Sequence, residues 1–203
     1  MNAGMYRLAF DSPEDYRREV ADRHNLPFQK CATLGTAANM NNAAICIERF
    51  CDLEVVTVCT GGVEGNAGRA GDPATYYEPQ DDSAKGQIDL ECERRPGTIN
   101  AMIFLNRELT PGAMVTAVIT VTEAKTAALQ ELVVGSKYSE GLATGTGTDQ
   151  IAVASKLGGK AISFAGKHSK VGELIGRTMH DAVLETLALQ NGLTAAGQCS
   201  SLA

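Results

Sequence analysis

The sequence contains no tryptophan, and aromatic residues make up only 5% of its 203 residues. It has no apolar run near the roughly 20 residues of a membrane-spanning helix, and its start lacks the charged-then-apolar pattern of a secretory signal. Basic residues are not in excess, since 18 Lys and Arg against 24 Asp and Glu give a net charge of −6. These absences argue against a membrane span, export and nucleic-acid binding, because phosphate binding favours a basic surface.

A metal-binding or disulfide pattern is also missing among the six cysteines. There is no CxxC pair, and no cysteine–histidine cluster has the spacing of a zinc site. Cys46, Cys51 and Cys59 lie in apolar stretches, where a free thiol behaves as a small hydrophobic side chain. We therefore expect buried, reduced thiols rather than a disulfide framework, no protein-bound metal, and a cytoplasmic location.

The residues that are present are typical of an ordinary globular domain. Hydrophobic residues make up 44% and charged residues 21% of the chain, which excludes disorder as its main state. The length allows one domain with a substantial core, or at most two small ones. The 21 glycines indicate tight turns and backbone that can approach a ligand closely.

Hydrophobic periodicity predicts a single α/β (or α+β) domain over residues 1–203, with a mixed sheet packed by helices. Residues 1–30 are expected to form an N-terminal helical extension, with Ser12 and Pro13 starting its helix. A polar, proline-containing excursion is expected at 73–85. The expected elements are helices at about 13–24, 111–132 and 170–190, and strands at 53–60, 98–105, 151–155 and 161–164.

The two long helices are assigned from their caps and apolar stripes. The stretch at 111–132 also alternates like a strand, but the Thr110–Pro111 cap and a strongly helical second half favour a helix. Asn191–Gly192 is expected to end the last helix. The expected stripes are Met114, Val118, Val121, Lys125, Leu129 and Leu132 for the first, and Val171, Leu174, Ile175, Met179, Ala182, Val183 and Leu187 for the second.

Four polar clusters at the edges of apolar segments are candidates for a binding site; they span 34–44, 60–72, 96–106 and 143–155. Glycine lets backbone approach a ligand, while Asn and Thr supply donors and acceptors, which suits a neutral ligand rich in amides. The four regularly spaced glycines at 62, 65, 68 and 71 alone would favour a flexible surface turn. The candidate binding residues Asn66, Arg69 and Asp72 in that cluster favour a binding loop.

Several single residues have both a structural and a catalytic interpretation. Asp149, near Thr146 and Thr148, could orient a water or an amide, or could form an N-cap or Asx-turn before the strand at 151–155. Lys125 lies on an apolar stripe, where the commoner explanation is that its stem packs and its ammonium reaches water. Glu123, two residues away, faces another direction. Thr98 follows Gly97 at the start of a strand and could expose a nucleophilic hydroxyl.

Residues 161–169 imitate a phosphate-binding loop without matching it. A P-loop needs glycine at its first position and Ser or Thr after the lysine, but Ala161 and His168 stand there. His168 is then either a general acid or base, or a neighbour of a helix cap. TGTGTD likewise does not match a dinucleotide fingerprint, because no third glycine follows at the required place.

Taken in order, five strings resemble the adenosylcobinamide amidohydrolase family (CbiZ) over about residues 31–189, with residues 1–30 carrying less of the likeness. The strings are TVCTGGVEGNAGRAGD, GTINAMIFLN, MVTAVITVTEAKTAALQEL, ATGTGTDQIAVAS and GKHSKVGELIGRTMHDAV. The resemblance implies hydrolysis of the amide that joins aminopropanol to the corrin ring of adenosylcobinamide. The products are adenosylcobyric acid and aminopropanol, used in corrinoid salvage and cobalamin biosynthesis. No cofactor is implied, since the cobalt belongs to the substrate.

For that reaction we expect Asp149 or Glu123 to activate a water, and Lys125 or the amides of 145–148 to stabilise the oxyanion. Asn66, Asn100 and Thr146 would orient substrate amides, with Arg69, Asp72, Thr148 and His168 as further binding candidates. In the alternative mechanism Thr98 is a covalent nucleophile, since the run from GTIN to TGTGTD also resembles the self-processing aminopeptidases of the DmpA type. The competing functions are a non-catalytic corrinoid or nucleotide carrier and an ATP-using enzyme. A homo-oligomer is compatible with a chain of this size.

Overall fold

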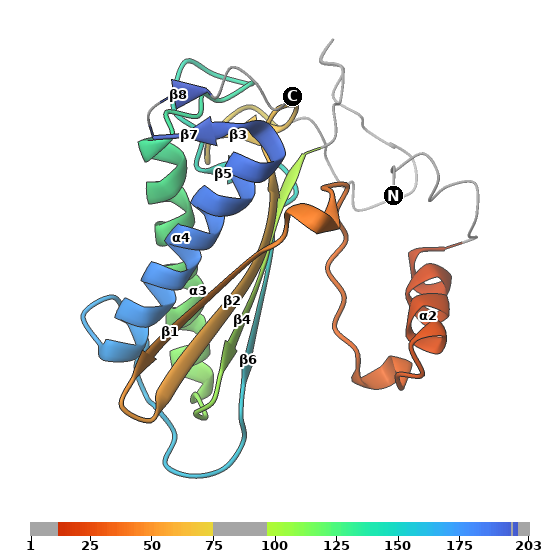
Figure 1. The fold of residues 1–203 in the computed structure, drawn as a ribbon, viewed down its shortest axis with the longest axis vertical. Coiled ribbons are helices and arrows are strands. Elements are labelled where there is room, and N and C mark those ends of the chain that lie inside the picture. Colours follow the sequence, from red (N-terminus) through yellow and green to blue (C-terminus); the bar gives the residue numbers. More distant parts are fainter. Residues whose placement is uncertain (1–11, 75–96, 196, 199–203) are drawn as a thin grey trace.

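In the computed structural model, which describes residues 12–74, 97–195 and 197–198, four strands form a mixed sheet in the order β1-β2-β4-β6 (Figure 1). Strand β2 runs antiparallel to both β1 and β4, and β4 pairs with β6 in parallel. This confirms the expected α/β class. The strands are β1 (Ala44–Phe50), β2 (Leu53–Gly62), β4 (Thr98–Leu105) and β6 (Gln150–Ser155).

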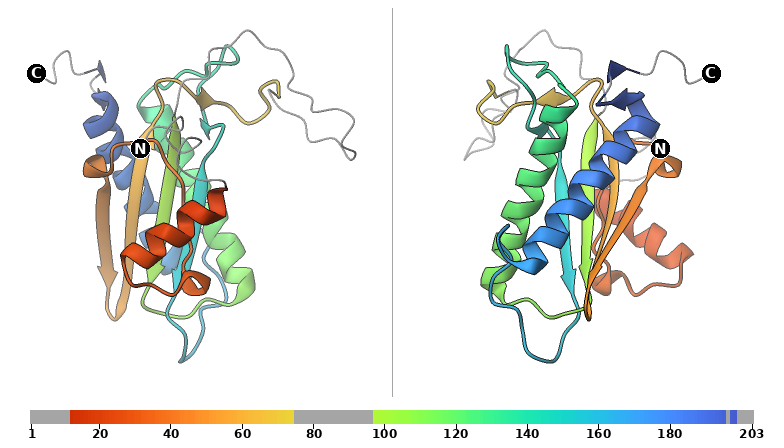
Figure 2. Two further views of the ribbon diagram at one scale, coloured as in Figure 1. Left: turned by 90° about the vertical axis from the view of Figure 1, so that its right-hand side faces the viewer. Right: turned by 60° about the vertical axis from the view of Figure 1, so that its left-hand side comes forward.

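Two long helices cover one face of this sheet (Figure 2). Helix α3 (Pro111–Glu131) connects β4 to its parallel neighbour β6, and α4 (Lys170–Asn191) follows β6. The Thr110 side chain accepts a hydrogen bond from the Ala113 amide and starts α3, as expected. Gly192, in the left-handed region at φ 64°, ends α4. No helix in the part of the chain that the structure describes combines the length and the apolarity needed to cross a bilayer.

The hydrophobic core lies between the helices and the sheet. All seven apolar residues predicted for the inner face of α4 are buried, and the Thr57 hydroxyl of β2 donates to the Thr178 hydroxyl of α4 at 2.8 Å. The stripe predicted for α3 is only partly right, because Val118 is 40% exposed. Ala113, Ala117 and Ala128 take part in the buried stripe instead, since small residues let α3 pack closely.

Two strand assignments need correction. Strand β1 was not predicted, although it forms a hairpin with β2 in the register Ala44 to Cys59. Conversely, residues 161–164 do not form a strand; Ile162 makes one isolated bridge to Leu109. The chain leaves that pairing because the backbone of Ala165 bonds to the side chains of Thr116 and Thr120 in α3.

The described cysteines are free thiols with different environments. Cys59 is fully buried, and burial raises its pKa to about 12; Cys46 is half-buried, and burial, with Glu185 nearby, raises its pKa to about 11. Cys51 is exposed, so the expectation of burial is wrong there. It lies in the turn between β1 and β2 at φ 52°, where no neighbouring layer covers it.

Short elements surround the two layers. β3 (Ala67–Gly68) pairs with β5 (Gly145–Thr146), and β7 (Leu193–Thr194) pairs with β8 (Gly197–Gln198). The N-terminal part forms α2 (Pro13–Arg23) and the 3₁₀ turns η1 (Phe28–Lys30) and η2 (Met40–Asn42). Helix α2 begins at Ser12 and Pro13 as expected. The excursion predicted at 73–85 lies outside the described residues from position 75 onward.

The sheet face turned away from α3 and α4 is apolar and exposed; we call it the open face. In the left view of Figure 2, α2 lies in front of this face while α3 and α4 lie behind the strands. Ile45 is 62%, Ile47 49% and Phe104 43% exposed. The open face consists of Ile45, Ile47, Val56, Val58, Met102 and Phe104.

Two glycines of α4 give opposite predictions for the same substitution. A Cβ on Gly172 would lie 2.1 Å from the Gly166 carbonyl oxygen, whereas on Gly176 its nearest neighbour would be 3.9 Å away. We expect Gly172→Ala to lower the free energy of unfolding by about 2 kcal/mol through overpacking. The matched Gly176→Ala should raise it by roughly 0.5–1 kcal/mol through helix propensity. Urea unfolding followed by circular dichroism measures both; equal effects would contradict the close contact.

Candidate functional site

An ion pair between Lys125 of α3 and Asp149, the residue before β6, lies at the end of the sheet. Both side chains are close to fully buried, at 8% and 11% exposure. Asp149 Oδ2 accepts from Lys125 Nζ and from the Thr146 amide at 3.0 Å. Its Oδ1 accepts from the Ile99 amide at 2.9 Å and from the Thr146 hydroxyl. The commoner sequence interpretation, a lysine whose ammonium reaches water, is wrong.

Because of these four contacts, Asp149 joins helix α3, strand β4 and the loop that holds β5. The loop closes tightly around the carboxylate: a Cβ on Gly145 would lie 2.3 Å from Asp149 Oδ2 and 2.7 Å from Lys125 Nζ. Only glycine allows that approach. The partners of Asp149 lie in other segments or earlier in its own loop, so its contacts are not those of a simple cap on the strand that follows.

Thr98 and Thr148 interlock beside this pair. The Thr98 hydroxyl donates to the Thr148 carbonyl at 2.8 Å, and the Thr148 hydroxyl donates to the Gly97 carbonyl at 3.1 Å. Thr98 is 6% exposed, so its side chain is buried and is not presented to solvent. Asn100, two residues along β4, donates through Nδ2 to the Gly35 carbonyl at 2.7 Å.

Asn66 also binds Gly97. Its Nδ2 donates to the Gly97 carbonyl at 2.9 Å, and its Oδ1 accepts from the Tyr138 hydroxyl at 2.7 Å. A Cβ on Gly97 would lie 2.9 Å from the Gly62 carbonyl oxygen, so glycine is required there. The Gly97 carbonyl therefore accepts two side-chain hydrogen bonds.

Arg69 and Asp72 brace the loops that β3 and β5 join. Asp72 accepts hydrogen bonds from Ser136, from Ser139 and from the Arg69 amide, and these bonds hold its pKa below the usual range. Arg69 Nη1 donates to the Leu142 carbonyl at 3.1 Å. Both side chains thus bind protein groups in this structure and hold the loop of 60–72 against that of 136–146.

Glu123 and His168 lie together in a different place. Both line an exposed groove with Phe164 and Lys167, and Lys167 Nζ pairs with the Glu123 carboxylate at 2.6 Å. Glu123 is two residues from Lys125 on α3 and so faces another direction. Lys167, the lysine of the segment that resembles a P-loop, is therefore paired with a carboxylate. Ser169 caps the N-terminus of α4.

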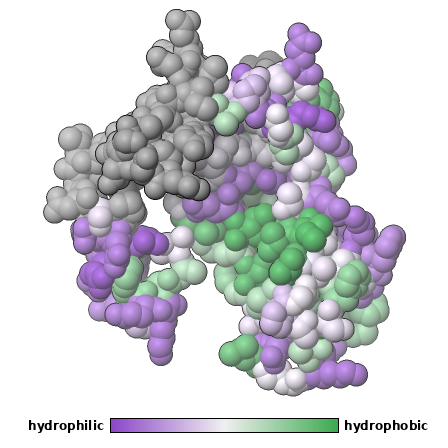
Figure 3. All heavy atoms as spheres, turned by 180° about the vertical axis from the view of Figure 1, so that it is seen from behind, coloured by the Kyte–Doolittle hydropathy of each residue, from purple (hydrophilic) through white to green (hydrophobic). Residues whose placement is uncertain are grey.

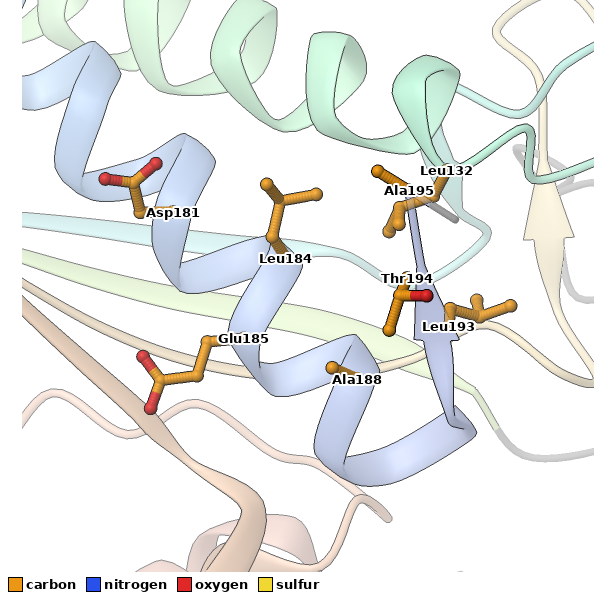
Figure 4. Close-up of a pocket in the computed structure, with 8 residues that line it drawn as sticks. All are labelled: Leu132, Asp181, Leu184, Glu185, Ala188, Leu193, Thr194 and Ala195. Atoms are coloured by element: carbon orange, nitrogen blue, oxygen red, sulfur yellow. The ribbon is translucent and has the colours of Figure 1, made fainter. Parts of the chain in front are cut away.

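A second groove runs along α4 (Figure 4). Leu132 from the end of α3, Leu184 and Ala188 from α4 and Leu193 from β7 make it largely apolar, as Figure 4 shows. None of the residues predicted for the site lines it. Among the described residues, no group of three or more His, Cys, Asp or Glu side chains is arranged to hold a metal ion.

The structure therefore gathers most predicted residues around one point. Lys125 and Thr146 bond directly to Asp149, and the Thr148 amide donates to the Thr146 hydroxyl at 3.4 Å. Thr98, Asn100 and Asn66 extend this network through the Thr148 carbonyl, the Thr98 hydroxyl and the Gly97 carbonyl. The sequence did not indicate Tyr138, which donates to Asn66. It indicated Gly35 and Gln150 only as members of the clusters 34–44 and 143–155; Gly35 accepts from Asn100 and donates to Gln150. An aromatic residue in the polar stretch GSKYSEG was the one signal for Tyr138. The pairing of β3 with β5 could not be predicted from the sequence, because two residues a strand are too few to show an alternating pattern.

The chain is similar to a known protein family and to a protein of another organism. The model of the family described as adenosylcobinamide amidohydrolase matches residues 2–195. An uncharacterized protein of Methanocaldococcus jannaschii is 38% identical over 181 residues, which cover 88% of this chain and 71% of that protein. Both matches extend over the segments that form the group around Asp149.

Removing either partner of the Lys125–Asp149 pair should destabilise the fold. We expect Lys125→Met and Asp149→Asn each to lower the free energy of unfolding by about 3 kcal/mol, because each leaves a buried group without its partner. The double variant should lose clearly less than the sum. Lys167→Met, which removes an exposed pair, is the control and should cost less than about 1 kcal/mol. Additive losses in denaturant unfolding would show that the pair contributes no coupling.

Proposed function

Because the chain belongs to the adenosylcobinamide amidohydrolase family, we propose that it hydrolyses the amide joining aminopropanol to the corrin ring of adenosylcobinamide. Water adds its oxygen to the amide carbon, the carbon–nitrogen bond breaks, and the nitrogen takes up a proton. The products are adenosylcobyric acid and aminopropanol, and the reaction belongs to corrinoid salvage in cobalamin biosynthesis. The observation that carries the proposal is the buried Lys125–Asp149 pair among polar loops.

In this mechanism Lys125 stabilises the oxyanion that forms when water attacks the amide carbon. A cation held in a largely buried site interacts strongly with developing negative charge and needs little reorganisation. Asp149 fixes the Lys125 ammonium through their ion pair. The amides of 145–148, which wrap the same carboxylate, are the second candidate donors.

We assign the role of base to Asp149, with the Thr146 hydroxyl as the connection to the attacking water. Asp149 accepts four hydrogen bonds. One of them comes from the half-buried Thr146 hydroxyl, whose O–H can rotate and so can accept a proton from water while it donates its own to Asp149. Thr146 would pass the proton of water to Asp149. Glu123 lines the separate groove with Lys167 and His168 and does not contact Lys125 or Thr146, which favours Asp149 in this role.

Asn66, Asn100 and Thr148 would shape the wall that meets the substrate amides. They lie on three separate segments that the Gly97 and Gly35 carbonyls tie together. We place Arg69 and Asp72 farther out as supports of that wall, since both are engaged by protein groups. We propose no cofactor held by the protein, and a cytoplasmic location, where the free thiols would stay reduced.

Incubation with adenosylcobinamide and chromatography of the products tests the function. We expect aminopropanol release without ATP, and a loss of about 100-fold or more in kcat for Asp149→Asn, because a general base contributes that much. Glu123→Gln is the matched carboxyl-to-amide control and should retain turnover. Corrinoid binding and unfolding are measured for each variant, so that loss of fold is separated from loss of chemistry.

Other outcomes of this assay identify the competing functions. Tight binding of the corrinoid without turnover by the unmodified protein would make it a carrier. Dependence on ATP would indicate an ATP-using enzyme, with residues 161–169 as its candidate phosphate-binding loop. Near-normal turnover by both carboxyl variants would mean that the assigned base is wrong.

A second mechanism has one observation in its favour. The Gly97 carbonyl accepts from Asn66 and Thr148, which would polarise it toward attack by the Thr98 hydroxyl beside it. That hydroxyl, however, donates to a backbone carbonyl, which cannot take up its proton. We therefore favour water as the nucleophile.

Intact-mass spectrometry separates the two mechanisms. We expect one uncut species of 203 residues and an active Thr98→Ser variant, with Thr98→Ala also retaining turnover once its fold is verified. A chain cut between Gly97 and Thr98, or an acyl adduct on Thr98, would establish the covalent mechanism instead.

A further inference from the structure

The open face carries apolar side chains in two rows across the sheet. Strand pairing sets Ile45 beside Val58 and Met102, and Ile47 beside Val56 and Phe104. Ile45 and Ile47 are about half or more exposed, so no layer of the described chain packs on this edge of the face. A contiguous apolar surface of this kind usually marks a binding site.

One end of the open face becomes polar where it meets the candidate site. Thr60, Asn100 and Gln150 form the next row across the strands. Gly35 crosses above this row, since its amide donates to Gln150 Oε1 at 3.1 Å and its carbonyl accepts from Asn100. Gln150 directly follows Asp149, so the polar row lies between the apolar rows and the Lys125–Asp149 pair.

Helix α2 stands over this face without packing on it. Figure 1 shows α2 apart from the sheet, and Figure 3, seen from behind, shows a hollow between the polar lobe that contains α2 and the body, where apolar surface gathers. In α2, Ala21 is the one buried side chain among those described. Apart from Pro13, Val20 and Ala21 the helix consists of polar and charged residues and Tyr16, so it offers few apolar groups to the hollow. Its position leaves room for a small ligand and obstructs a second flat sheet.

We propose that the open face holds the corrin ring of the substrate, with the ring's apolar face against the apolar rows. This inference rests on the proposed function and adds where the ring binds. The macrocycle is flat and apolar across its face, while its amide side chains project from the rim. A ring on the open face would direct rim amides to the exposed Gln150 and to the Gly35 segment that Asn100 holds, and the scissile amide past them toward Lys125 and Asp149.

The occupant we assign also fits the composition of the face. Phe104 is its one aromatic side chain, so the ring would be held by aliphatic contacts and amide hydrogen bonds. The polar side chains of α2 would face the opposite side of the ligand, which carries the adenosyl group. A second copy of the chain would instead need a large apolar surface free of such an obstruction.

Three variants test the assignment. Met102→Lys places a charge in the middle of the open face on a central strand, and Met102→Leu keeps its apolar character. Ile119→Lys is the matched control, because Ile119 is 52% exposed on α3 at the other side of the sheet. Binding of adenosylcobinamide and of adenosylcobyric acid is followed by equilibrium dialysis and corrin absorbance. KM and kcat are measured by aminopropanol release, and sedimentation gives the oligomeric state.

We expect Met102→Lys to weaken binding of both corrinoids and raise KM by about tenfold or more, with kcat changed little. Met102→Leu and Ile119→Lys should behave as the unmodified protein. Unchanged binding in a folded Met102→Lys variant, with normal turnover, would overturn the inference and leave the proposed function standing. Corrinoid binding that depends on Met102 without any turnover would support the inference and reject the hydrolase. A dimer that Met102→Lys dissociates would identify a second copy as the occupant and overturn the inference.

Discussion

The arrangement of this molecule depends on the buried contact between Lys125 and Asp149. A charged pair this far from water is retained only where both groups also satisfy their hydrogen bonds. Asp149 does so with backbone and side-chain donors from β4 and from its own loop. The same contacts that satisfy the carboxylate therefore fix where the sheet ends, where α3 lies and how the loop after Gly145 closes.

Around that pair, the polar loops support one another through backbone carbonyls. The Gly97 carbonyl accepts hydrogen bonds from the side chains of Asn66 and Thr148, and the Gly35 carbonyl accepts one from Asn100. Segments distant in sequence therefore form one wall. A catalytic group contributes most when its geometry exists before the substrate binds. The two packed layers provide that rigidity, and the open face on the other side of the sheet is apolar and exposed.

Much of the fold could be predicted from the sequence, because local signals agree with the tertiary structure. The cap at Thr110 and the glycine at 192 define helix ends, and the inner face of α4 follows a clear 3.6-residue period. The bounds expected for β4 are those observed. Strand β1 was missed because it lies at the edge of the sheet with Ile45 and Ile47 exposed. Its apolar residues therefore do not follow the pattern of a strand with one buried apolar face and one polar face. The sequence predicted most residues of the candidate site but not which of them contact each other. Asp149, the partner of Lys125, lies 24 positions away along the chain, and no local pattern indicates such a pair.

The low aromatic content and the many glycines now have one explanation: close backbone approach builds the wall, and aliphatic side chains build the apolar surface. The most direct test of this account is a crystal structure of the protein with adenosylcobyric acid, whose carboxylate marks the position of the cleaved amide. We predict that this carboxylate lies within hydrogen-bond distance of Lys125 Nζ, with the ring on the open face. A product carboxylate bound in the groove of Glu123 and His168, away from Lys125, would contradict it.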